Sequence, residues 1–159
     1  MVSGRIALIG VCALTWTAGA LAGSGGTNGE TVYASRCAAC HQPGGNGAPG
    51  FAPPLAGTLG TYLHNPEGRS YLANLVVAGM NGRIESQGHQ YNGVMPPFSA
   101  LSDDELAAVL NHVLERFNRA SLPDAHTPVS AAEIAAARSR KPSPGQVHRQ
   151  RLQLLGEAN

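Results

Sequence analysis

Apolar residues recur at helical spacing in two parts of this chain. Ser70 to Ala78 presents one apolar face, and Gly79 follows as a stop signal. The stronger pattern begins after Ser102, which forms a capping box with Glu105. The apolar residues of this second pattern are Leu106, Val109, Leu110, Val113 and Leu114. We therefore predict two helices, of which the second runs to about residue 117 and supplies the main protein contribution to the core.

Shorter helices are predicted at both ends of the chain. Gly29 to Arg36 is typical of a short helix. Near the other end, Ser130 with Glu133 and the Ser143-Pro144 pair with Gln146 are helix-start signals. They predict short helices at about 131–139 and 145–155, after a linker at 118–129. The expected fold is therefore all-α.

Two segments show no helical periodicity. Residues 42–68 are rich in Gly and Pro, which predicts a long loop. Residues 80–101 are expected to be irregular, with the pairs Asn81-Gly82 and Asn92-Gly93 as turn signals.

The first residues are typical of a secretory signal rather than of a folded element. Arg5 precedes an apolar stretch from Ile6 to Trp16, and small residues follow. This order predicts a signal peptide over residues 1–22 with cleavage near Ala22, and hence an exported, periplasmic protein. A membrane anchor is the alternative, but the stretch is shorter than the ~20 residues that a span needs, so we expect no membrane span in the mature form.

Composition sets further limits on the function. The 159 residues allow one domain with extensions, and a net charge of +1 gives no indication of nucleic-acid binding. Aromatic residues make up only 5% of the chain, which suits a small domain that borrows part of its core from a cofactor. Residues 23–118 carry four basic and seven acidic residues, whereas 119–159 carry six basic and three acidic ones. A basic tail that folds back on the domain and one that docks elsewhere both fit this contrast.

The strongest motif is Cys37-Ala38-Ala39-Cys40-His41. Covalent haem attachment needs two thiols that reach the two vinyl groups of one porphyrin edge, with an imidazole directly after them to bind the iron. Cys12 leaves with the signal, so the mature chain keeps only this Cys pair. We therefore expect one covalent haem c, with its iron bound by His41.

Two other uses of a Cys pair compete with haem attachment. A redox disulfide normally follows a strand, and no strand pattern precedes Cys37. A zinc site needs two further ligands, usually a second pair at short spacing, but the remaining mature histidines are scattered singly.

With these residues, the sequence resembles the class I c-type cytochromes over residues 29–118. In that family a Gly stands eight residues and an aromatic four residues before the first Cys, as Gly29 and Tyr33 do here. The Gly lets the first and last helices cross closely, and the ring packs into the crossing. The family usually has an aromatic partner on the last helix, where the nearest equivalent here is His112. The resemblance implies a small fold of short helices wrapped around one haem, with residues 119–159 as a linker and basic helical extension.

The resemblance also suggests further haem contacts. Pro53 stands where the family has a Pro whose carbonyl accepts a hydrogen bond from the axial His, although a rigid turn explains it equally well. Met95, before Pro96, matches the family's Met-Pro ligand loop and is the expected sixth ligand, ahead of Met80. Tyr91 and Asn92 either donate to a haem propionate or build the turn. The loop histidines that compete with methionine for the iron are His64 and His89.

A six-coordinate iron has no open position for a substrate, so the expected function is one-electron transfer without a reaction of its own. The expected partners are redox proteins, such as a dehydrogenase, an oxidase or a membrane complex, with no small-molecule substrate. Residues 91–98 and the tail are also similar to cytochrome subunits of periplasmic dehydrogenases, which makes a subunit of a larger oxidoreductase the main alternative. A haem sensor with an open sixth site is a third. No haem contact is expected beyond Phe117, so truncation after about Arg119 should leave the haem spectrum unchanged.

Overall fold

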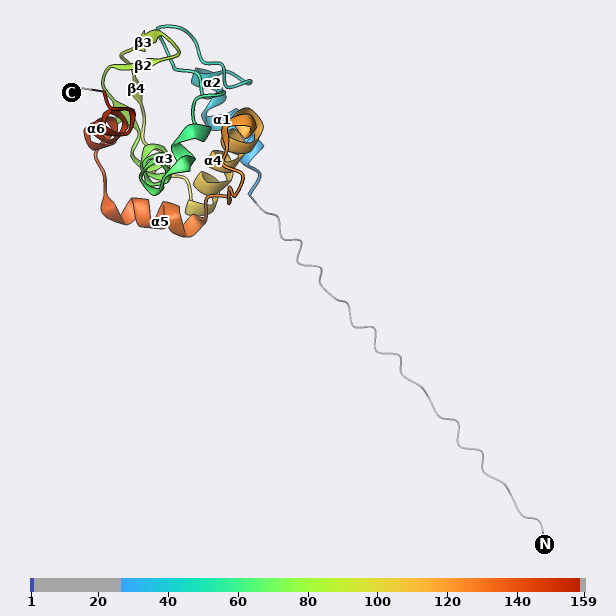
Figure 1. The fold of residues 1–159 in the computed structure, drawn as a ribbon. Coiled ribbons are helices and arrows are strands. Elements are labelled where there is room, and N and C mark those ends of the chain that lie inside the picture. Colours follow the sequence, from blue (N-terminus) through green and yellow to red (C-terminus); the bar gives the residue numbers. More distant parts are fainter. Residues whose placement is uncertain (2–26, 158–159) are drawn as a thin grey trace.

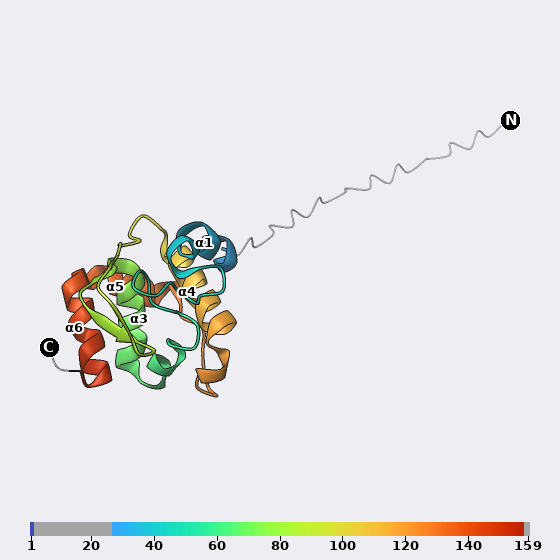
Figure 2. The same ribbon diagram turned by 90° about the horizontal axis from the view of Figure 1, so that it is seen from above.

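The computed structural model describes Met1 and residues 27–157, so the predicted signal peptide, apart from Met1, lies outside the described residues. The described part is mostly helical, which confirms the predicted fold class (Figures 1 and 2). Its α-helices are α1 (Gly29–Arg36), α2 (Ala38–His41), α3 (Pro66–Ala78), α4 (Asp103–Phe117), α5 (Ala131–Arg140) and α6 (Pro144–Leu155). Two 3-10 helices, η1 (Gly60–His64) and η2 (Arg119–Ser121), connect them. Among the described helices, none combines the length and the apolar character that crossing a membrane requires.

Helices α1 and α4 cross closely at Gly29. A Cβ atom at Gly29 would overlap the backbone carbonyl of Ala108, so only glycine permits this approach. The Tyr33 ring packs into the crossing, with centroids 5.5 Å from His112 and 5.2 Å from Phe117. The predicted crossing is therefore present, and Phe117 supplies the aromatic partner that the sequence comparison left to His112.

Helix α3 begins four residues before the predicted start, inside the segment expected to be a loop. The Asn65 side chain caps it by accepting a hydrogen bond from the Gly68 amide at 2.6 Å, and Pro66 occupies the first turn. Gly68 is needed in the helix because a Cβ there would overlap the Tyr62 carbonyl of η1. The sequence pattern assigns Pro66 and Gly68 to a loop. In the structure Pro66 starts the helix, and Gly68 lets η1 pack against it.

The segment expected to be irregular is a bent β-hairpin. Its strands are β1 (Met80–Asn81), β2 (Ile84–Ser86), β3 (His89–Tyr91) and β4 (Val94–Met95), paired β1 with β4 and β2 with β3. The chain reverses at Gln87-Gly88, where both residues have positive φ, as a two-residue hairpin turn requires. The two Asn-Gly pairs lie at the junction between the β1–β4 pair and the β2–β3 pair rather than at the chain reversal. The strands are too short to show a clear alternation of apolar and polar residues, so the sequence did not predict them.

The C-terminal helices α5 and α6 pack on α3 and share the core of the domain (Figures 1 and 2). The side chains of Ile134, Ala137 and Val147 are fully buried there. They belong to the same apolar cluster as Leu72 and Leu114. The tail thus folds back on the domain, one of the two arrangements that its charge left open.

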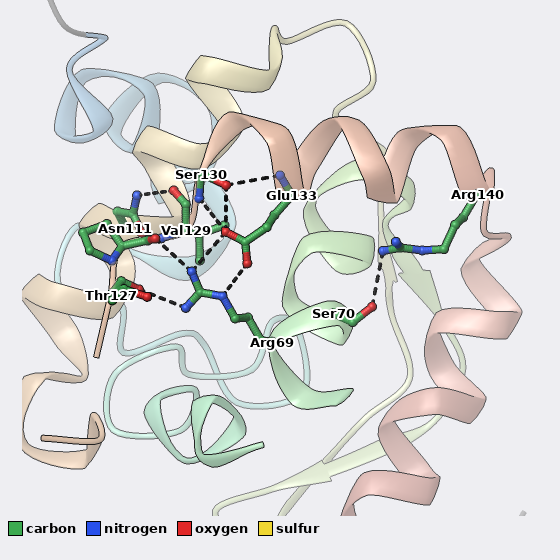
Figure 3. A network of polar contacts seen from close by, with 9 residues as sticks. Arg69, Ser70, Asn111, Thr127, Val129, Ser130, Glu133 and Arg140 are labelled. Atoms are coloured by element: carbon green, nitrogen blue, oxygen red, sulfur yellow. Dashed lines mark hydrogen bonds and ion pairs between the residues drawn. The ribbon is translucent and has the colours of Figure 1, made fainter. Parts of the chain in front are cut away.

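Polar contacts also tie the tail to α3 and α4 (Figure 3). Arg69 of α3 pairs with the Glu133 carboxylate and donates to the carbonyls of Thr127 and Pro128. Asn111 of α4 exchanges two hydrogen bonds with the backbone of Val129, at 2.8 and 2.7 Å.

Arg69 is a basic residue of the acidic segment 23–118, and Glu133 is an acidic residue of the basic segment 119–159. The opposite net charges of the two segments therefore do not account for this pair. The other described ion pair between domain and tail, Arg138 with Asp103, follows those net charges, so the two pairs do not decide between the charges. Because partly exposed ion pairs contribute little, the burial of Ile134 and Val147 is the larger contribution to holding the tail.

Replacement of Ile134 tests whether the tail belongs to the cooperative core. Ile134→Ala removes fully buried apolar volume and should lower the free energy of unfolding by about 3 kcal/mol, measured by urea denaturation. Ala135→Ser changes an exposed position of the same helix and should alter it by less than ~0.5 kcal/mol. Equal stability of the two variants would show that the tail unfolds independently.

The Arg69–Glu133 pair predicts an acid-dependent loss of stability. Hydrogen bonding from Arg69 lowers the pKa of Glu133 from 4.5 to about 2, against the opposing effect of burial. Because the folded-state pKa is the lower one, the contribution is complete above pH 4.5 and is lost as the pH falls towards 2. Glu133→Gln keeps a capping-box residue but cannot titrate, so its unfolding free energy should fall less than that of the wild type over this window. Parallel pH profiles for the two proteins would contradict the assignment.

Candidate haem-binding site

The Cys-Cys-His motif lies where α1 gives way to α2. Cys37 ends α1, and the His41 amide donates to the Cys37 carbonyl at 2.9 Å, so one helical turn joins the first Cys to the His. Cys37, Cys40 and His41 all line one cavity of about 570 Å³. The structure therefore brings the three predicted attachment residues together on one wall.

The rest of the cavity wall comes from elements far apart in the sequence. The hairpin and α6, which contact each other, contribute residues to it, as do α3 and α4. Five of the seven Tyr and Phe side chains line it: Phe51, Tyr62, Tyr71, Tyr91 and Phe98. The other two, Tyr33 and Phe117, pack together at the α1–α4 crossing. A large and mostly apolar cavity with a thiol pair and an imidazole fits a haem well.

His41 is oriented by a single backbone contact. Its Nδ1 atom lies 2.9 Å from the carbonyl oxygen of Pro53. Because a carbonyl only accepts hydrogen bonds, Nδ1 carries the proton, and Nε2 keeps a lone pair for a metal. Burial lowers the pKa of His41, against the opposing effect of this hydrogen bond, so the neutral imidazole is favoured. A neutral ring with its proton on Nδ1 is the form of histidine that binds a metal through Nε2.

The loop that carries Pro53 closes tightly over the motif. The Gly47 amide donates to the His41 carbonyl at 2.9 Å. Gly47 has positive φ, and a Cβ there would overlap the Ala52 carbonyl. The hydrogen bond predicted for Pro53 is therefore present, in a loop whose backbone contacts need glycine at position 47.

Neither alternative use of the Cys pair is favoured. Burial raises the pKa of the Cys37 thiol to about 11, with the charge of Cys40 adding to the rise, whereas redox Cys pairs carry a thiol of lowered pKa. Within the described residues, no group of three or more His, Cys, Asp or Glu side chains is arranged to hold a metal ion, as a zinc site would need.

Met80 and Met95 lie opposite each other on β1 and β4, and both line the cavity. Directly paired residues of antiparallel strands share a face, which explains why both reach the same space. The environments of the two sulfur atoms differ. The hydroxyl of Tyr71 donates to the Met80 sulfur at 3.9 Å, and Met80 is buried, whereas Met95 is half-buried. Within the described residues the Met95 sulfur has no hydrogen-bond donor.

The other predicted site residues divide into two groups. Tyr91 is buried and lines the cavity, whereas Asn92 is exposed and is not among the lining residues. His64 and His89 are exposed and also lie outside the lining, which removes the support for either as a competing ligand. His64 instead contacts the backbone carbonyl of Ser121, with its Nε2 atom 3.1 Å from that oxygen.

Sequence reasoning missed the contribution of the tail. Arg151 and Leu155 of α6 line the cavity, so the tail offers candidate haem contacts beyond Phe117 that were not predicted from the sequence. The buried Arg151 guanidinium donates to the Glu85 carbonyl at 2.6 Å and pairs with Glu157 at 3.4 Å. A signal was available, because Val147, Arg151 and Leu155 recur at i, i+4 and i+8 and so place one charge on the inward face of α6.

Three of the residues that line the cavity are exposed apolar residues, and we call this set the apolar rim. Phe51, Val94 and Leu155 are 62%, 76% and 44% exposed, and all three line the cavity. The first two come from adjacent segments, because a Cβ at Gly93 would lie 3.2 Å from the Phe51 carbonyl. An apolar rim at an opening is typical of a contact surface.

Comparison with known proteins agrees with this geometry. Residues 26–116 match the family model described as "Cytochrome c". The chain is 42% identical over 127 residues to "Cytochrome c-552" of Thermus thermophilus, an alignment that covers 80% of this chain and 96% of that protein. A second cytochrome c-552 sequence from the same organism gives the same identity, with 85% of its length covered.

Proposed function

Because the chain belongs to the cytochrome c family, we propose that it is an exported, periplasmic one-electron carrier with a six-coordinate c-type haem. Family membership implies electron transfer and a covalently bound haem with iron. Export is supported by the signal-like start of the sequence. It is supported independently by the haem motif, because haem attachment of this kind takes place outside the cytoplasm.

The attachment residues follow from the motif at the start of α2. Cys37 and Cys40 would form the two thioether bonds, and His41 would bind the iron through Nε2. This role for His41 is supported by its neutral imidazole, whose Nδ1 is held by the Pro53 carbonyl so that Nε2 keeps a lone pair for the iron. When bound, the haem iron supplies the one-electron change between the ferric and ferrous states.

Met95 is the proposed second axial ligand. The observation that favours it is the contrast between the two methionine sulfurs that line the cavity: the Met80 sulfur accepts a hydrogen bond from Tyr71, whereas the Met95 sulfur accepts none within the described residues. Thioether ligation raises the reduction potential relative to two histidines and leaves no open iron position. That combination suits electron transfer rather than substrate chemistry.

Arg151 adds a positive charge to the cavity wall. Its guanidinium is buried and only partly compensated by Glu157, which is exposed. A nearby cation favours the state of the iron that carries the smaller positive charge, so Arg151 stabilises the reduced form. It is also a suitable partner for a haem carboxylate.

The partner surface is proposed to be the apolar rim formed by Phe51, Val94 and Leu155. Electron transfer requires close approach of the partner to the cofactor, and the rim lies at the opening of the cavity. The partner is another redox protein, such as a dehydrogenase, an oxidase or a membrane complex.

A subunit of a larger dehydrogenase complex is less favoured. That alternative rests on the similarity of residues 91–98 and the tail to such subunits, and on the extra length of the tail, for which a free carrier had no evident use. The burial of Ile134 and Val147 and the position of Arg151 give the tail a role within this chain. Its length therefore no longer indicates a second protein.

Replacement of each of the two methionines by alanine tests whether the iron is six-coordinate. Met95→Ala should open the sixth position, abolish the long-wavelength absorption band of sulfur–iron coordination, lower the potential and allow carbon monoxide to bind the ferrous iron. Met80→Ala is the matched control and should keep the band, at a cost of about 2–4 kcal/mol in stability. The reverse pattern would move the ligand to Met80, and carbon monoxide binding by the wild type would favour a sensor with an open site.

Replacement of Arg151 tests its electrostatic role. Arg151→Gln should lower the reduction potential by about 50 mV, because it removes a cation that stabilises the ferrous state. Arg149→Gln is the control, since Arg149 lies on the same helix but is exposed and does not line the cavity. Redox titration of both variants should show a shift only for Arg151. Equal shifts would mean that only net charge matters.

A further inference from the structure

The backbone that follows Met95 has few bonds of its own. Residues 96–101 connect β4 to α4, and Pro96 and Pro97 have no N–H to donate. Within this connection the only backbone hydrogen bond runs from the Leu101 amide to the Phe98 carbonyl, at 3.0 Å. The two prolines restrict φ, but the segment has no backbone hydrogen bond of its own to the rest of the described residues, although it directly follows the residue proposed to bind the iron.

Arg138 of α5 supplies the bonds that the connection lacks. Its Nη1 donates to the Ser99 carbonyl and its Nη2 to the Leu101 carbonyl, each at 2.9 Å, while its Nε donates to the Asp103 carboxylate at 2.9 Å. No other described side chain or distant backbone group makes a hydrogen bond to residues 96–101. A planar guanidinium is suited to this task because its donors have a fixed geometry.

The helix that carries Arg138 is itself fixed. Ile134 and Ala137, on the same helix, are fully buried between α3 and α4. On the other side of Met95, β4 pairs with β1, and a Cβ at Gly79 would overlap the Met95 carbonyl, so the two strands approach closely there. Met95 is thus held by the β1–β4 pairing before the connection and by Arg138 after it.

We propose that Arg138 is a positioning residue for the Met95 thioether, by which the C-terminal segment keeps the ligand loop closed. The inference rests on the proposed ligation of the iron by Met95. It gives α5 a function beyond core packing. Without the three hydrogen bonds of the Arg138 guanidinium, which we call the Arg138 fork, the connection and Met95 can move away from the iron. An external ligand then competes more easily for the sixth position.

The chain offers a matched control in Arg69. Arg69 also joins the domain to the tail through one carboxylate and two carbonyls, those of Glu133, Thr127 and Pro128 (Figure 3). Its partners lie in the tail, far in sequence from Met95. The two arginines therefore contribute comparable docking bonds, and only Arg138 acts on the ligand loop.

The test is a titration of the ferric holoprotein with imidazole, in which binding is measured by the loss of the sulfur–iron absorption band. Arg138→Gln should bind imidazole about tenfold more tightly than the wild type, as expected when charge-assisted hydrogen bonds to the loop are lost. Arg69→Gln should stay within about twofold of the wild type. Urea denaturation should show similar losses of stability for both variants, which separates positioning from general destabilisation.

A conservative variant separates the fork from the charge. Arg138→Lys keeps the cation but cannot hold two carbonyls and a carboxylate at once, so it should resemble Arg138→Gln. It also serves as the test if Arg138→Gln does not fold. Tight binding in Arg138→Gln together with wild-type binding in Arg138→Lys would assign the effect to charge and overturn the positioning role.

Failure of this inference is distinguishable from failure of the proposed function. If the wild type lacks the sulfur–iron band, or Met95→Ala leaves it unchanged, the ligand assignment is wrong and the inference falls with it. If the band is present and lost in Met95→Ala, but Arg138→Gln and the wild type bind imidazole equally, only the positioning role is overturned.

Discussion

The need to enclose an apolar cavity of about 570 Å³ with a chain poor in aromatic residues governs this structure. Five of the seven Tyr and Phe side chains line that cavity, which leaves only Tyr33 and Phe117 for the crossing of α1 and α4. Most of the wall comes from residues before 118, but these do not form all of it. Helix α6 completes it with Arg151 and Leu155, so the tail forms part of the wall rather than an appendage.

The two sides of the site are built in different ways. On the His41 side, backbone contacts fix the ring: a helical turn, the Gly47 amide and the Pro53 carbonyl all lie within a short stretch of sequence. On the Met95 side, the pairing of β4 with β1 is comparably local, but the contacts that hold the connection after Met95 come from Arg138, in the distant helix α5. Local contacts form at little entropic cost, whereas distant ones depend on the completed fold. The methionine side is therefore the one that mutation or partner binding should loosen first.

This difference also explains what the sequence could predict. The motif at Cys37, the Gly29 crossing and the capping boxes of α4, α5 and α6 depend on residues close together in the chain, and the structure contains each predicted helix. The hairpin at 80–95 was missed because its two short ladders show no alternation. The start of α3 was missed because Pro66 and Gly68 occur both in loops and at helix starts. The spacing of Val147, Arg151 and Leu155 indicates an inward-facing charge on α6, but the contacts of Arg138 with the Ser99 and Leu101 carbonyls are tertiary contacts that no local pattern fixes.

A carrier must exclude water from its cofactor and still allow a partner to come close. Here α6 serves the first need, since its residues Arg151 and Leu155 form part of the cavity wall, while α5 packs on α3 and α4 outside that wall. Helix α6 stops short of covering the rim, where Phe51, Val94 and Leu155 remain exposed. Leu155 belongs to both regions, because it is an exposed residue of the same helix that places Arg151 inside the wall. The end of α6 therefore joins the wall that holds Arg151 to the surface proposed for electron exchange. If both proposals hold, a change there affects the reduction potential and partner binding together.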